Sequence, residues 1–181
     1  MNGQIDSGMP TSELHYWAQI VSDLLTLPRE TEWLEFKYNR ADPTEIGEYI
    51  SALANAAVLA DKPAGYMLWG IDDSTREPVG TTFKPFDAKG AGNEDLLNWL
   101  TRLLSPKLDF RFIEITLAGQ PLVLLEVPAA ATTPIGFQGQ EFIRVGANKK
   151  RLRELAEHER KLWRRAAHSR CRRCASRMPD R

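Results

Sequence analysis

The order of predicted elements in this 181-residue chain indicates an α+β fold, with a mixed, mainly antiparallel sheet and helices packed against it. Two observations predict this class. The first half alternates helical and strand patterns, and the second half is dominated by strands joined by short turns that contain Gly. Hydrophobic residues make up 43% of the chain, which is enough for one ordinary core. We therefore expect a helix over 1–27 packed on a domain over 28–148, followed by a basic helix and disordered tail over 149–181.

The N-terminal elements follow from periodicity. Residues 11–27 place apolar side chains at three- and four-residue steps, which predicts an amphipathic helix. In "WLEFKYN", alternation sends Leu34 and Phe36 to one face of a strand, and Glu35 and Lys37 to the other. This strand therefore has one apolar face and one charged face.

A second helix and a buried strand come next. Residues 42–60 open with Asp42 as a cap, followed by Pro and, three residues after the cap, by Glu45, which is a strong start signal. The near-continuous apolar run "YMLWGI" fits a central strand, and the polar "DDSTREPVG" after it is typical of a turn. Both elements are expected to contribute to the core.

The second half supplies the antiparallel strands. Residues 92–104 show helical spacing. "LDFRFIEITL" and "PLVLLEV" then predict a hairpin, and "IGF" with "EFIRVG" predicts a shorter one. A last helix is expected from about Leu152 to about Ala167.

Charge is distributed unevenly along the chain. Residues 1–148 carry 11 basic and 20 acidic side chains, a net charge of −9, whereas residues 149–181 carry 13 and 4, a net charge of +9. A basic segment of this kind favours contact with a polyanion such as nucleic acid, although pairing of its acids and bases along a solvated helix explains it as well.

A carboxylate and an ammonium share the charged face of the first strand. Glu35 and Lys37 lie two residues apart, a pairing that metal-dependent nucleases use to hold a divalent cation and to offset phosphate charge. A surface salt-bridge ladder explains the same pattern. Glu30 lies an odd number of residues from Glu35, so the two acids meet only if the chain bends between them.

Asp72 and Asp73 follow the central strand, at the end where ligands often bind in α/β sheets. The alternative is an Asx-type turn that serves only the backbone.

Several classes of function lack a motif. There is no Gly-rich phosphate loop, so no ATP site is expected, and no Ser/His/Asp or Cys/His arrangement is visible. Cys171 and Cys174, with His168, give only half of a zinc site. No signal peptide or membrane-length apolar run occurs, so we expect a cytoplasmic protein that does not contact membranes.

With these residues in view, the chain resembles a known family. The ordered series "ETEWLEFKYN", "EIGEYISALANAA", "GYMLWGIDD", "NEDLLNWLTRLLSPKLDF" and "FIRVGANKKRL" is similar to the AlbA-type domain, described as DNA-binding, of bacterial helicase-related transcriptional regulators and of Schlafen proteins. The resemblance covers about residues 28–163. The chain departs from it in the longer "ANAAVLADKPAG" and in the ending after "HERKLW", which suggests a truncated gene.

The resemblance implies two functions. In the bacterial branch the domain binds nucleic acid, and this is the function we expect here, for DNA or RNA. In the Schlafen branch it implies a divalent-metal-dependent endoribonuclease that cuts structured RNA with Mg²⁺ or Mn²⁺. The catalytic and metal-binding positions then fall on Glu30, Glu35 and Asp73, assisted by Lys37. We leave open whether the chain is an enzyme and whether it forms a homo-oligomer. The side chains expected to contact phosphates are Lys37, Arg40, Arg144, Lys149, Lys150 and Arg151.

Overall fold

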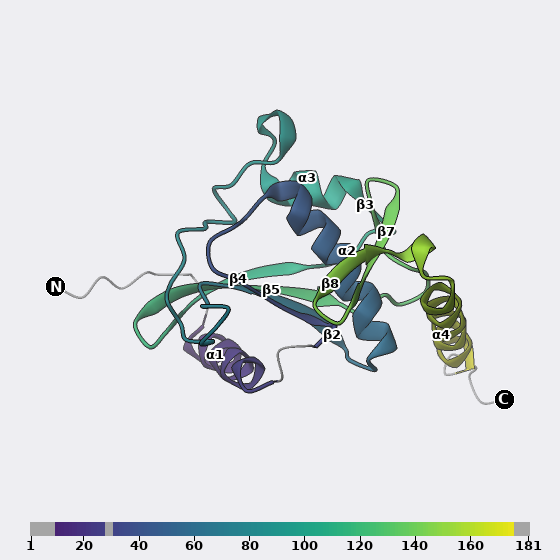
Figure 1. Ribbon diagram of the computed structural model, residues 1–181, viewed down its shortest axis with the longest axis horizontal. Helices are drawn as coiled ribbons and strands as arrows, with labels where there is room; N and C mark the ends of the chain where they lie inside the picture. The colour runs from purple at the N-terminus through teal and green to yellow at the C-terminus, as the bar shows by residue number, and fades with distance from the viewer. Residues whose placement is uncertain (1–9, 28–30, 176–181) are drawn as a thin grey trace.

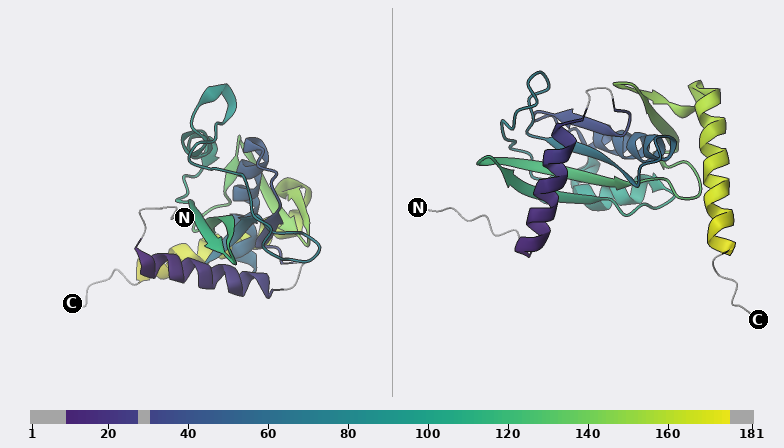
Figure 2. Two further views of the ribbon diagram at one scale, coloured as in Figure 1. Left: turned by 90° about the vertical axis from the view of Figure 1, so that its left-hand side faces the viewer. Right: turned by 90° about the horizontal axis from the view of Figure 1, so that it is seen from below.

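The computed structural model describes residues 10–27 and 31–175, and side chains through residue 165. A central four-stranded sheet lies between helices, and a second small sheet lies beside it (Figure 1). Helices α1 and α4 lie at opposite ends of the molecule (Figure 2). This arrangement confirms the predicted α+β class.

The central sheet is mixed, with the strand order β1-β2-β5-β4. Strand β1 (Leu34–Lys37) runs parallel to β2 (Ala64–Trp69), while β5 (Gln120–Pro128) is antiparallel to both β2 and β4 (Arg111–Leu117). Strand β1 therefore forms one edge of the sheet. The predicted hairpin over β4 and β5 is confirmed.

Alternation along the strands divides the core into two layers. On one face, Leu34 and Leu68 pack under helix α1 (Thr11–Leu25), which buries Trp17 and Val21. On the other face, residues such as Met67 pack against α2 (Pro43–Leu59) and α3 (Leu96–Leu103). Phe36 is only half-buried on the α1 side, because it lies on the edge strand. Glu35 and Lys37 consequently lie on the α2 face of the sheet.

Helix α2 begins as the sequence predicts. The backbone N–H of Glu45 donates to Oδ1 of Asp42 at 2.8 Å, and Pro43 occupies the first turn. Helix α3 begins at Leu96 rather than near residue 92, because Gly92 and Asn93 have φ of 72° and 64° in a short 3₁₀ segment, η1 (Ala91–Asn93). These left-handed residues interrupt the predicted helix.

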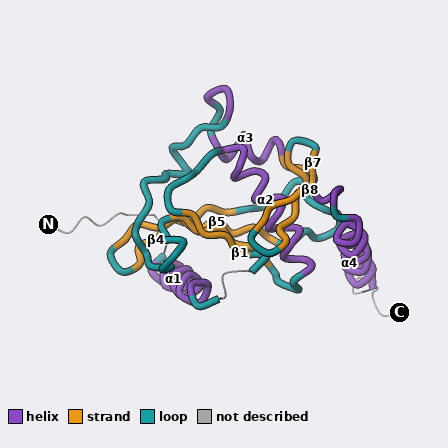
Figure 3. Tube along the Cα trace, in the orientation of Figure 1, coloured by secondary structure: helices purple, strands orange, loops and turns teal. Residues whose placement is uncertain are grey.

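The second sheet is antiparallel, with the order β3-β6-β7-β8. Its strands are β3 (Leu104–Ser105), β6 (Gly136–Phe137), β7 (Gln140–Val145) and β8 (Asn148–Arg151). The predicted hairpin of β6 and β7 is confirmed, whereas β3 and β8 were not predicted. Figure 3 shows the strands of this sheet near α2, away from α1.

Two buried polar side chains of α2 hold the second sheet in place. Ser51 Oγ donates to the carbonyl of Ile135 at 2.7 Å and accepts from the N–H of Phe142 at 2.9 Å. Asn55 donates to both of these residues' carbonyls and accepts from the N–H of Ile135. Strand β7 is thereby fixed against α2, and its side chains gain defined positions near β1.

The chain ends in η2 (Leu152–Glu154) and α4 (Ala156–Ala175). Leu162 anchors α4, fully buried in a cluster with Ala56 and Ile143. The helix continues beyond Ala167, where we expected it to end. No helix of the described part is both long and apolar enough to cross a membrane.

Candidate functional site

Glu35 is neutralised by two cations from different strands. One carboxylate oxygen lies 2.8 Å from Lys37 Nζ on β1, and the other lies 2.8 Å from the guanidinium of Arg144 on β7. The Glu35 side chain is only 12% exposed. The carboxylate therefore joins the edge of the central sheet to the second sheet.

Arg144 is a buried structural residue rather than a surface cation. It is 2% exposed, and besides Glu35 its guanidinium donates to the backbone carbonyls of Thr31, at 3.2 Å, and Leu34. A buried guanidinium requires such partners. We expected Arg144 to contact phosphates, but the structure directs its charge inward because β7 is buried on both faces.

Lys37 extends the ionic network towards α2. Its Nζ also lies 3.5 Å from Glu45, which in turn lies 2.8 Å from Nε of Arg40. Burial alone would lower the pKa of Lys37, but the hydrogen bond and charge of Glu35, with the charges of Tyr49 and Glu45, raise it above its ordinary value. Lys37 is therefore held protonated within the fold, whereas Arg40 is 75% exposed.

Tyr49 lies at the centre of this network. The ammonium groups of Lys37 and Lys149 lie 4.9 and 4.5 Å from its ring centroid, within the range of cation–π contact. Lys149 also lies 2.5 Å from Glu48 on the same helix. Burial raises the pKa of Tyr49, and the negative charge of Glu35 raises it further. The ring thus connects α2 to strands β1 and β8.

Asp72 and Asp73 lie on a turn after β2. Oδ1 of Asp72 accepts the backbone N–H groups of Ser74 and Thr75, at 2.9 and 2.8 Å, which confirms the Asx-type turn. Asp73 is exposed on this turn, and Glu30 lies outside the described residues. No group of three or more His, Cys, Asp or Glu residues among those described is placed to hold a metal ion. Catalytic and metal-binding roles for Glu30, Glu35 and Asp73 remain predictions.

One group of cations that face solvent lies on β8 and η2. Lys150, Arg151 and Arg153 are exposed and form no ion pair with the residues that the structure describes. We call these three residues the basic edge. The sequence analysis included Lys150 and Arg151 among the predicted phosphate contacts but missed Arg153. The only sequence feature that marked Arg153 was the high density of basic residues around it.

Helix α4 continues the basic surface. Its exposed cations through residue 165 are Arg160, Lys161, Arg164 and Arg165. Arg165 is paired with Asp61 near the end of α2. An open groove of about 520 Å³ lies beside this helix. It is lined by Lys161, Arg164, Arg165, His158, Glu32 and Leu59.

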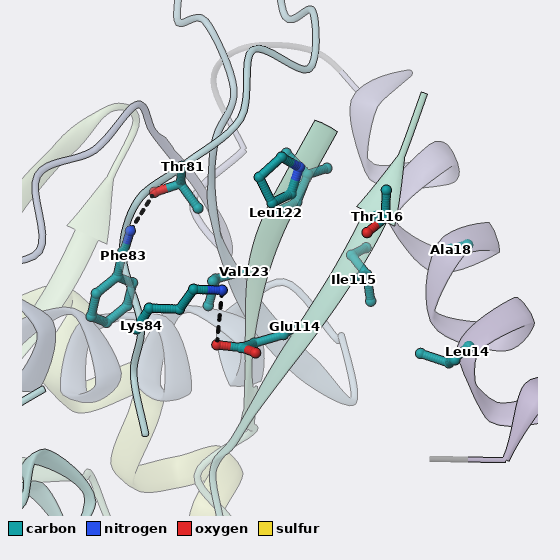
Figure 4. Close-up of a pocket in the computed structure, with 11 residues that line it drawn as sticks. Leu14, Ala18, Thr81, Phe83, Lys84, Glu114, Ile115, Thr116, Leu122 and Val123 are labelled. Atoms are coloured by element: carbon teal, nitrogen blue, oxygen red, sulfur yellow. Dashed lines mark hydrogen bonds and ion pairs between the residues drawn. The ribbon is translucent and has the colours of Figure 1, made fainter. Parts of the chain in front are cut away.

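A separate small pocket of about 180 Å³ lies between α1 and strands β4 and β5 (Figure 4). Its apolar lining includes Leu14, Ile115 and Val123, and the ion pair of Lys84 with Glu114, at 3.8 Å, lies across it. None of the side chains predicted to be functional lines this pocket.

The mixed sheet between helices, the second sheet fixed on α2 and the charged edge strand define an α+β domain of the AlbA type. The family model described as "Schlafen, AlbA_2" matches residues 30–153, so the chain belongs to this family. The predicted family resemblance is confirmed. No curated protein matches the chain.

Two solved structures are similar to the chain at low identity. The DIP2311 protein from Corynebacterium diphtheriae is 18% identical, with a TM-score of 0.47, over 78% of this chain and 27% of that chain. The N-terminal domain of a RecG-related protein from Nitrosomonas europaea is 22% identical, with a TM-score of 0.40, over 74% of this chain and 91% of that domain. This chain spans about a quarter of the DIP2311 protein.

Proposed function

We propose that this domain binds nucleic acid and that the basic edge, Lys150, Arg151 and Arg153, supplies the main phosphate contacts. One observation carries the proposal: these three cations lie within the segment 150–153 and are exposed, without an acidic partner among the described residues. Charged groups that need no partner inside the fold are available to neutralise phosphates. The neighbouring cations of α4 add to the same positive end of the chain.

The buried network supports the proposal indirectly, by fixing the position of β8. Lys149 points to Glu48 and the ring of Tyr49, while Arg144, on the paired strand β7, is bound to Glu35. These inward contacts hold the hairpin in place, so Lys150, on the opposite face of β8, and Arg151, at the end of the strand, are presented at fixed positions. In this proposal Lys37, Arg144 and Lys149 position the surface, while Arg40 is a peripheral contact.

The described geometry gives less support to RNA cleavage. Both carboxylate oxygens of Glu35 already contact cations, and Asp73 lies on an exposed turn with no contact to Glu35 among the described interactions. A divalent cation at Glu35 would therefore compete with Lys37 and Arg144 for the same carboxylate oxygens. We place binding first for this reason.

Equilibrium binding to labelled tRNA and to duplex DNA tests the proposal. The variant Lys150→Ala/Arg151→Ala/Arg153→Ala should bind at least about tenfold more weakly, since hydrogen bonds to charged groups contribute roughly 1.5–3 kcal/mol each. The control is Lys89→Ala/Arg102→Ala/Lys107→Ala, which removes the same number of exposed cations around α3. These cations have partners within the fold: Lys89 pairs with Asp95, Arg102 pairs with Glu94, and Lys107 donates to carbonyls at the end of α3. The control should bind like the wild type.

The same samples test cleavage. With Mg²⁺ or Mn²⁺ added, we expect a shift of the labelled tRNA without fragments. Fragments that appear with wild-type protein and disappear with Glu35→Gln would favour the ribonuclease instead. Equal binding by wild type and the basic-edge variant would refute the proposed surface.

A further inference from the structure

Trp163 is an exposed aromatic side chain on a helix that is otherwise polar on its outer face. It is 48% exposed, although Trp is usually well buried. The preceding residue, Leu162, is fully buried, and one helical step rotates the next side chain by about 100°. The anchor at Leu162 therefore holds Trp163 away from the core.

The other tryptophans have structural positions. Trp17, Trp69 and Trp99 are at most 3% exposed, and Trp33 is half-buried with Lys62 over its ring. Trp163 forms no ring contact with the described residues. Packing within the domain does not account for this side chain.

Charged side chains lie beside Trp163 on α4. Glu159 and Arg160 lie four and three residues before it, on the same side of the helix, while Arg164 is exposed on the adjacent side and Lys161 on the opposite side. The helix directly follows the basic edge and lies at the end of the molecule opposite α1 (Figure 2). An exposed aromatic ring on a helix whose described part is net basic is suited to a polyanion that also offers flat apolar groups.

We propose that Trp163 stacks on an unpaired base, so that the domain prefers single-stranded or locally unpaired nucleic acid to a continuous duplex. This inference rests on the proposed function. Unpaired bases offer a free π-face to an aromatic side chain, whereas bases inside a duplex are already stacked on one another. In this proposal Arg160, one turn before Trp163 on the same side of the helix, contacts a backbone phosphate while the ring holds the base.

The test compares a single-stranded 12-mer with the corresponding duplex. Trp163→Ala should weaken binding to the single strand by about tenfold, within the range of single stacking contacts, and leave duplex binding within about twofold. Trp163→Tyr should retain most of the single-strand affinity because it keeps a ring. The control Phe86→Ala removes another exposed ring, on the acidic part of the chain, and should change neither affinity.

Fluorescence quenching gives a second readout. Acrylamide should quench the fluorescence of Trp163 in the free protein, and bound single strand should reduce this quenching. In Trp163→Phe, the single strand should no longer change the quenching of the remaining tryptophans. If Trp163→Ala binds the single strand as tightly as wild type does, or loses affinity for both ligands equally, the stacking proposal is wrong. If wild-type protein binds neither ligand, the proposed function itself fails.

Discussion

Replacing Arg144 by Met should destabilise the domain strongly, because the buried Glu35 carboxylate loses one of its two cationic partners and the carbonyls of Thr31 and Leu34 lose a donor. Arg144 is 2% exposed and contacts Glu35 as well as the carbonyls of Thr31 and Leu34. Breaking a buried ion pair from one side costs about 3–5 kcal/mol. For a chain of this length, that corresponds to a fall in melting temperature of roughly 6–20 °C.

Urea unfolding followed by circular dichroism measures this loss. The matched control is Arg111→Met, because Arg111 also lies 2.8 Å from a glutamate, Glu126, but is 58% exposed. That pair should contribute no more than about 1 kcal/mol. Adding Glu35→Gln to Arg144→Met should restore part of the stability, since it removes a buried carboxylate that only one of its two cations, Lys37, still contacts. A loss below about 1 kcal/mol for Arg144→Met would refute the assignment of Arg144 as a buried clamp.

Three further predictions concern α2. The raised pKa of Tyr49, caused by burial and then by Glu35, means that the folded protein holds the phenol proton more tightly than the unfolded chain does. The stability that this proton contributes is complete below about pH 10 and is lost as pH rises through the folded pKa. The free energy of unfolding, measured with urea, should therefore fall less between pH 9 and about 11 in Tyr49→Phe than in wild type. Gly47→Ala should destabilise by about 1–3 kcal/mol despite better helix propensity, because the new Cβ would lie 2.3 Å from the Phe137 ring, and thermal melting checks this. Asn55→Ala should cost at least about 3 kcal/mol by leaving buried backbone groups of the second sheet unpaired, and the amide of residue 135 should lose protection in hydrogen exchange.

Local patterns predicted much of the fold. The start of α2 depended on residues within one turn of each other, and the Asp42 cap was found as expected. The two faces of β1 followed from alternation alone, so Glu35 and Lys37 were correctly placed together. These features are set by neighbours in sequence.

The features that sequence reasoning missed depend on distant partners. Strand β8, "NKKR", has no apolar alternation and forms because it pairs with β7. Ser51 and Asn55 look like ordinary helix residues, and their role appears only where their partners, 80 to 91 residues away, approach α2. Tertiary pairing decided these positions rather than local propensity.

The candidate site was predicted in part for the same reason. Basic residues were found by composition, but composition did not separate inward from outward side chains. Arg144 and Lys149 are paired neighbours on β7 and β8 that both point inward, while Lys150 and Arg151 are exposed. Alternation along β8 puts Lys150 on the face opposite Lys149, whereas Arg151 shares the face of Lys149 and is exposed at the end of the strand, and composition predicts neither position.

The salt dependence of binding tests the central claim most directly. Each phosphate neutralised by the protein adds about 0.9 to the slope of log K against log salt concentration for duplex DNA and about 0.7 for a single strand. The basic-edge variant, without Lys150, Arg151 and Arg153, should therefore have a slope shallower than that of wild type by about 2–3, and the α3 control should match wild type. An unchanged slope for the basic-edge variant, or an equal change in the control, would contradict the account.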